Sequence, residues 1–237
     1  LFTAGQINGT SGYEEAAAQG LIAGINAVKK INQEEALVLK RNEAYIGVLI
    51  DDLINKGITE PYRLLTSRAE FRLLLRHDNA DIRLTEIGRK VGLINDEKYN
   101  IFKNKLAKIT ELQEYLTKTK INNTEETNNY LSTLSSSPIN VSVSSIELLR
   151  RPEIKIDNIE HLLNIVFDES AKEQVEINIK YQGYIEKTQK EAEKMLSLEK
   201  KQIPENIDYR KVSIFYDGRL KSIGTTGIIN LKIKFNK

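Results

Sequence analysis

The fold of this chain is decided near its amino end, where residues 5–20 read GQINGTSGYEEAAAQG. Three glycines fall within the first eight residues of this run, and alanines follow them. Glycine permits positive φ and lets the backbone come close to a ligand. The pattern predicts a glycine-rich loop and then a helix from Tyr13 to Lys30, whose small side chains suit close packing against a sheet.

The start of that helix suits an electron-rich ligand. Thr10 or Ser11 is positioned to cap the helix, and the first free N–H groups of the helix then face whatever lies in front of the loop. Leu1 to Ala4 is a brief apolar run that reads as the end of a strand. A run of small residues is more often a packing device than a site, so the loop alone leaves both interpretations open.

Composition excludes several classes of site. The chain has 237 residues, a formal net charge of +2 and no cysteine. Disulfides, cysteine-ligated metals and a cysteine nucleophile are therefore excluded within it. His77 and His161 are its only histidines and lie far apart in sequence, which argues against a metal centre. The sequence also lacks a membrane-length apolar run and a signal-peptide pattern, which predicts a cytoplasmic location and no membrane partner.

The remainder of the chain reads as mainly α-helical. Residues 43–56 favour an amphipathic helix ended by Gly57, with a buried strand as the alternative. A polar loop with one helical turn is expected over Asn122–Pro138. The other expected helices cover residues 68–76, 85–92, 95–119, 146–150, 159–166 and 168–200, with Asn95 or Asp96 and Ser144-Ser145 as caps.

Two adjacent carboxylates, Asp51 and Asp52, invite a metal or acid–base interpretation. Neighbouring residues on a helix point about 100° apart, so these side chains would not converge on one ion. A solvated or arginine-paired role is therefore favoured.

A row of arginines is the strongest nucleic-acid signal. Thr66-Ser67 can cap a helix over residues 68–76, with Glu70 completing a capping box. Arginines at every fourth position would then share one face, where their guanidinium groups match phosphate oxygens. A solvated face with acidic partners is the competing interpretation. The candidate RNA-binding set is Arg63, Arg68, Arg72, Arg76, Arg83, Arg89 and Lys90.

An aromatic pair, Tyr181 and Tyr184, lies on the predicted helix over residues 168–200. Exposed aromatic rings can stack on bases. At helical spacing a buried apolar stripe is the favoured interpretation.

The opening run is more specific as a whole string than its glycines are. It resembles the GidA/MnmG family of flavoproteins, which modify uridine at the tRNA wobble position. The resemblance continues through ordered blocks, which are YIGVLIDDL at 45–53, EPYR at 60–63, TSRAEFRLLLR at 66–76 and DNADIRLT at 78–85. After Val212 the match fails, and the tail alternates apolar and polar residues like a strand; a shifted reading frame would explain this.

The resemblance implies a helical C-terminal domain preceded by a strand–loop–helix remnant of an α/β, Rossmann-like FAD-binding domain. Residues 1–43 would be the end of the FAD domain, and residues 44–237 the helical domain that binds tRNA and a GTPase, with a polar linker near 120–140. We therefore expect the chain to be the C-terminal part of a longer protein, because its own dinucleotide-binding loop would lie upstream.

The resemblance also implies an activity. Relatives bind FAD, use NADH as reductant, form homodimers and work with the GTPase MnmE in a heterotetramer that adds a (carboxymethyl)aminomethyl group to C5 of the wobble uridine. No catalytic residue is expected here, since the family's cysteines would lie upstream. A non-catalytic RNA-binding or subunit-assembly module is the alternative. The expected FAD-contacting residues are Gly5, Gln6, Asn8, Gly9, Thr10 and Gly12.

Overall fold

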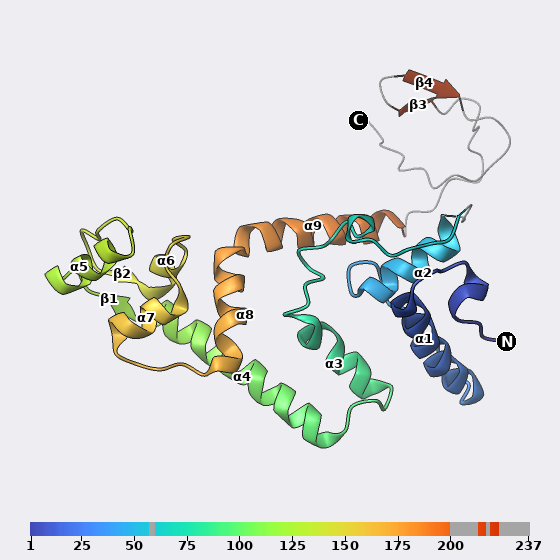
Figure 1. Ribbon diagram of the computed structural model, residues 1–237, viewed down its shortest axis with the longest axis horizontal. Coiled ribbons are helices and arrows are strands. Elements are labelled where there is room, and N and C mark those ends of the chain that lie inside the picture. The colour runs from blue at the N-terminus through green and yellow to red at the C-terminus, as the bar shows by residue number, and fades with distance from the viewer. Residues whose placement is uncertain (57–59, 200–212, 217–218, 223–237) are drawn as a thin grey trace.

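The computed structural model describes residues 1–56, 60–199, 213–216 and 219–222. The described chain is mainly helical, which confirms the predicted fold class (Figure 1). The α-helices are α1 Tyr13–Ile31, α2 Tyr45–Asn55, α3 Ala80–Lys90, α4 Asp96–Lys118, α5 Glu125–Thr133, α6 Ser145–Leu149, α7 Ile156–Leu163, α8 Glu169–Lys180 and α9 Gln182–Glu199. Two antiparallel strand pairs join β1 Lys120–Ile121 to β2 Val143–Ser144, and β3 Ser213–Tyr216 to β4 Arg219–Ser222.

The described helices are spread along an elongated molecule. α1 and α2 lie together at one end of Figure 1, and α5, α6 and α7 gather at the other. α4 reaches from α3 into the second group, and α8 packs along it.

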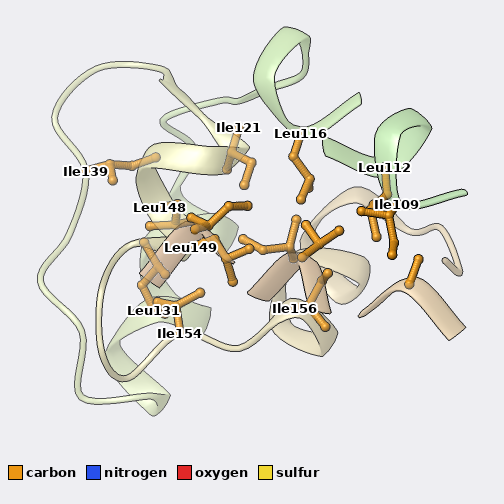
Figure 2. Close-up of a cluster of buried hydrophobic side chains, with 14 residues drawn as sticks. Ile109, Leu112, Leu116, Ile121, Leu131, Ile139, Leu148, Leu149, Ile154 and Ile156 are labelled. Atoms are coloured by element: carbon orange, nitrogen blue, oxygen red, sulfur yellow. The ribbon is translucent and has the colours of Figure 1, made fainter. Parts of the chain in front are cut away.

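The main core lies where α4 and α8 meet α5, α6 and α7 (Figure 2). Leu116 of α4, Leu131 of α5 and Leu149 of α6 are completely buried there. Burying a leucine side chain contributes about 2 kcal/mol, so this core is the principal source of stability in the carboxyl half. A smaller cluster near α2 joins Val48 to Ala69 and Leu75.

Local signals predicted several helix starts correctly. Asn95 caps α4 by accepting a hydrogen bond from the Lys98 N–H at 3.0 Å. Ser144 caps α6 and forms a capping box with Glu147. Residues 45–55 form a helix and not a strand. The predicted stop at Gly57 lies outside the described residues.

The polar segment Asn122–Pro138 contains more regular structure than the expected loop with one helical turn, because it forms the nine-residue helix α5 and places Leu131 in the core. α5 begins after Thr124, whose hydroxyl accepts a hydrogen bond from the Thr127 N–H. The Ile139 N–H donates a hydrogen bond to Asn128 Oδ1 at 2.8 Å, and the Leu131 and Ile139 side chains are buried. The polar residues serve as caps and braces, which is why they resembled a loop in the sequence.

The long helix expected over residues 168–200 is two helices, α8 and α9. The backbone leaves helical geometry at Tyr181, with φ −104° and ψ 10°, and the chain turns sharply there (Figure 1). Tyr181 and Tyr184 are 49% and 69% exposed, so the expected core stripe is wrong. α8 buries Ala171, Val175 and Ile179 instead.

Residues 1–4 are not in a strand, although Ala4 has extended backbone angles. The apolar run offers strand geometry without a pairing partner in the described part of the chain. At the other end, residues 228–237, which were expected to form a strand, lie outside the described residues.

Candidate functional site

The glycine-rich loop, residues 5–12, begins with a short 3-10 helix at Gly5–Asn8. Gly5 and Gly9 have φ of +84° and +86°, a region that residues with a side chain rarely adopt. Both glycines are therefore required by the backbone path.

The buried Gln19 side chain of α1 stabilises this loop through hydrogen bonds. Its Oε1 accepts hydrogen bonds from the Gly5 N–H at 3.2 Å and from Asn8 Nδ2 at 2.7 Å. Its Nε2 donates to Thr10 Oγ1 at 2.9 Å and to the Glu15 carbonyl at 3.1 Å. Gln19 is only 5% exposed, so these bonds are shielded from water. The loop is consequently a pre-formed element.

The helix cap differs from the prediction. The N-cap of α1 is Gly12, and no side chain caps it. Thr10 is buried and bonded to Gln19, while the Ser11 hydroxyl bonds to the Tyr62 carbonyl. Because neither hydroxyl turns toward the helix end, the expected cap at Thr10 or Ser11 is wrong.

Glu15 joins the first turn of α1 to a distant segment. Its Oε1 accepts the Leu64 N–H at 2.8 Å, and its Oε2 lies buried against Gly12 without a hydrogen-bond partner. The hydrogen bond from Leu64 lowers the pKa of Glu15, with nearby Arg63 adding a smaller effect in the same direction. A Cβ at residue 12 would overlap this carboxylate, so a side chain there would displace Glu15 from its present position.

The expected FAD-contacting residues differ in whether their side chains are exposed or already bonded within the loop. Gln6 is exposed and its side chain is available to a ligand. Asn8 is bonded to Thr3 and Gln19, and Thr10 is buried, so both brace the loop. The three glycines contribute backbone shape. Their roles toward a cofactor stay predictions.

The segment around Tyr62 forms backbone hydrogen bonds with the outer edge of the loop. The Tyr62 N–H donates to the Gly9 carbonyl at 2.7 Å, and the Ser11 N–H donates to the Tyr62 carbonyl at 3.0 Å. These bonds form a parallel bridge between Thr10 and Tyr62. The guanidinium of Arg68 lies 4.6 Å from the centre of the Tyr62 ring.

Arg41 is the centre of an ion-pair cluster that includes the aspartate pair. It bonds to Asp51 at 2.8 Å, to Asp52 at 2.6 Å and to Glu70 at 2.7 Å. The arginine-paired interpretation of the aspartates is thus confirmed. Burial opposes ionisation of Asp52, but hydrogen bonds from Lys56, Arg41 and Tyr62 outweigh it and lower its pKa. The bond to Glu70 is the main cause of a raised pKa at Arg41.

The helix expected over residues 68–76 is absent, so its arginines do not share a helix face. Only Thr66–Arg68 is helical, as a 3-10 turn without a side-chain cap. Glu70, expected in a capping box, bonds to Arg41 instead. The physical reason is that Arg41 binds both the Glu70 carboxylate and the Arg68 carbonyl, which a regular helix would not present together.

The other candidate RNA-binding residues divide into two sets. Arg68, although exposed, donates to the Arg63 carbonyl. Three more arginines also have partners within the protein. Arg76 pairs with the Asp78 side chain, and Arg83 bonds to the Asn79 side chain and the Glu43 carbonyl. Arg89 bonds to the Ile94 carbonyl and the Asp96 side chain. In the remaining set, Arg63, Arg72 and Lys90 are exposed and form no ion pair with an acidic residue of the described chain.

Other types of site find no support in the described ranges. No group of three or more histidine, aspartate or glutamate side chains there is arranged to hold a metal ion. Nor does any helix within those ranges combine the length and apolarity needed to cross a membrane.

Sequence reasoning missed the residues that hold the loop. Gln19 had one signal, since it is a polar residue on the small-residue side of α1. Arg41 and Tyr62 had none, because their partners come from segments that are distant in sequence.

Two family descriptions match the chain. "Glucose inhibited division protein A" matches residues 1–35, and "tRNA modifying enzyme MnmG/GidA C-terminal helical domain" matches residues 96–189. The first match covers the glycine-rich loop and α1, and the second covers the main core.

Curated relatives carry the same family name. The Acholeplasma laidlawii protein "tRNA uridine 5-carboxymethylaminomethyl modification enzyme MnmG" is 57% identical over 212 residues, which are 90% of this chain and 34% of that protein. The Listeria monocytogenes protein of that name is 57% identical over 216 residues, with the same shares covered. The chain thus spans about a third of the length of the curated relatives it matches.

A solved structure supports the same assignment. Aquifex aeolicus GidA, in its form II crystal, matches with a TM-score of 0.73 and 40% sequence identity, covering 89% of this chain and 33% of that one. From the loop, the helical core and these matches together, we conclude that the chain belongs to the GidA/MnmG family.

Proposed function

We propose that this chain is part of an FAD-dependent enzyme that modifies the wobble uridine of tRNA. Its relatives are named as tRNA uridine 5-carboxymethylaminomethyl modification enzymes. In this proposal residues 1–43 supply one wall of the FAD site, and residues 44–237 bind tRNA and the GTPase MnmE. The enzyme acts as a homodimer within a heterotetramer with MnmE and takes electrons from NADH.

The observation that carries the proposal is the loop itself. Residues 5–12 are held on the inside by Gln19 and on the outside by Tyr62, yet the Gln6 side chain is exposed. A backbone fixed before binding loses little conformational freedom when a ligand arrives. A stiff loop with one exposed amide suits the edge of a flat heterocycle that both donates and accepts hydrogen bonds.

The residues of the loop fit a flavin wall. Gly12 has no side chain, and α1 begins there without a side-chain cap, so no capping side chain covers the Tyr13 and Glu14 N–H groups, whereas the Glu15 N–H already bonds to its own carboxylate. Glu14 and Glu15 lie in the same turn and offset the helix dipole. In this proposal the flavin is contacted by individual N–H groups of that turn and by the exposed Gln6 amide of the loop. FAD, when bound, would supply the redox chemistry.

In this proposal tRNA phosphates bind the exposed basic residues that form no ion pair within the described chain. Arg63, Arg72 and Lys90 have no acidic partner among the described residues, so their charge is available to phosphates. Tyr181 and Tyr184 add exposed rings that suit stacking on unpaired bases. Arg68, Arg76, Arg83 and Arg89 already have protein partners, and in this proposal they shape the surface around the exposed set.

The prediction is that Arg63→Glu combined with Arg72→Glu weakens tRNA binding at low salt by at least about tenfold. The slope of log K against log salt should fall by about 2, because two phosphate contacts are lost. Filter binding with the 237-residue chain across a salt series measures both quantities.

Lys103→Glu combined with Lys120→Glu is the matched control, since both lysines are exposed, neither forms an ion pair within the described residues, and the charge change is the same in sign. It should leave binding within about twofold, an expectation that rests on local phosphate contacts. Equal losses in the two double variants would assign binding to bulk charge and contradict the contact set. If sedimentation shows no tRNA complex for the unmodified chain, only the subunit-assembly alternative survives.

A further inference from the structure

A continuous series of contacts leads from Arg41 to the glycine-rich loop. Arg41 bonds to Asp52 at 2.6 Å, and Asp52 accepts the Tyr62 hydroxyl at 2.9 Å. The backbone of Tyr62 then pairs on both sides with Gly9 and Ser11. Each step joins a different segment of the chain, so Tyr62 connects the backbone of the loop to Asp52 of α2.

Tyr62 is held more firmly than its place in a non-helical segment suggests. Its side chain is buried, and Asp52 at its tip has no exposed side-chain surface. Arg68 lies over one face of the ring. The phenol is thus fixed at its tip and on its face, which fixes the backbone atoms that pair with the loop.

The loop has two supports of different kinds. Gln19 belongs to α1, the helix that the loop itself begins, so it sets the internal shape of the loop. Tyr62 belongs to a separate segment and to the α2 cluster, so it sets where the outer edge of the loop lies. Within the described residues, the second support relates the loop directly to the chain beyond α1, and the Glu15–Leu64 hydrogen bond adds an indirect connection through α1.

We propose that Tyr62 is a positioning residue for the glycine-rich loop, and that Asp52 and Arg41 act on the loop through its hydroxyl. The inference rests on the proposed role of the loop as a flavin wall. With Tyr62 in place, the exposed Gln6 amide and the N-terminal N–H groups of α1 hold one orientation toward the ligand. Without the hydroxyl bond, the loop keeps its internal shape but its outer edge is free to shift.

Tyr62→Phe tests this proposal because it keeps the ring and the backbone pairing and removes only the hydroxyl. Tyr99→Phe is the matched control. Tyr99 also donates its hydroxyl to a carboxylate, that of Glu86 at 2.9 Å, but it lies on α4 away from the loop. Amide hydrogen exchange of Ser11 and Tyr62 in the 237-residue chain reports the loop edge directly.

Tyr62→Phe should speed exchange at the Ser11 amide by about tenfold, the expected effect of losing a hydrogen bond to a charged partner, whereas Tyr99→Phe should leave it unchanged. A second readout uses a hybrid protein in which this chain replaces the segment it matches in the Acholeplasma laidlawii relative. There Tyr62→Phe should shift the flavin midpoint potential, which a general loss of stability would not do.

Unchanged Ser11 exchange in Tyr62→Phe would overturn the positioning role whatever the hybrid does. An unchanged potential in a flavin-loaded hybrid would also overturn it. A hybrid that binds no flavin would instead contradict the proposed function, and the exchange measurement would still decide the role of Tyr62.

Discussion

Gly47→Ala is expected to lower the free energy of unfolding by at least about 2 kcal/mol, because an added methyl group would overlap backbone atoms of a neighbouring segment. Gly47 lies in the first turn of α2 and is buried. A Cβ there would overlap the carbonyl oxygen of Lys40 and stand 2.6 Å from that of Leu39. The Lys40 carbonyl is held in place, since its oxygen accepts the Glu43 N–H at 3.0 Å.

Gly24→Ala provides the control for that substitution. Gly24 also lies inside a helix, α1, but a Cβ there would meet nothing within 4 Å. Alanine favours the helix over glycine by about 1 kcal/mol, so the same change should stabilise the chain slightly. Urea unfolding followed by circular dichroism compares the two variants. Equal effects would contradict the close approach at Gly47.

Arg41→Met is expected to cost about 3 kcal/mol of unfolding free energy, since it leaves a buried carboxylate with one cation, Lys56, instead of two. The Asp52 side chain has no exposed surface, and after the substitution only Lys56 and Tyr62 would remain bonded to it. Glu70 would lose its partner as well. The cost should therefore exceed that of any exposed ion pair in the chain.

A double-mutant cycle with Asp52→Asn isolates the pair. The double variant should lose less than the sum of the two single losses, because a neutral amide needs no cation.

The pH dependence of stability gives a second check on Asp52. The pKa of Asp52 is lower in the folded state than its ordinary value of 3.8, so its contribution is present above that value and is lost as pH falls below it. Asp52→Asn should remove that acid-dependent loss, and strictly additive losses would contradict the pairing.

The sequence predicted those elements whose cause is local. Asn95 and Ser144 cap helices through hydrogen bonds that span only three residues, so their spacing is readable. The positive φ of Gly5 and Gly9 likewise belongs to a motif that lies within one short run.

The arginine segment was misread because its cause is distant. Arginines at every fourth residue are typical of a helix, yet Arg41 lies 29 residues from Glu70 and bonds to it. Tyr62 and Ser11 are 51 residues apart, and no periodicity reports such a pair. The candidate site was therefore predictable in its loop and not in the residues that hold the loop.

The break between α8 and α9 had no clear signal either. The segment has charged residues on both sides of Tyr181, and a single long helix satisfied the same pattern. Packing decides the outcome, because α8 follows the core along α4 whereas α9 extends away from it (Figure 1).

The central claim is that the glycine-rich loop forms one wall of an FAD site through Gln6. The most direct test is the ratio of flavin to protein absorbance after gel filtration, measured in the Acholeplasma hybrid with and without Gln6→Ala. Gln33→Ala is the control, since Gln33 is also an exposed glutamine but lies beyond the far end of α1. We expect a full flavin ratio for the hybrid and for Gln33→Ala, and a clear loss for Gln6→Ala. A ratio that Gln6→Ala leaves unchanged would contradict the claim.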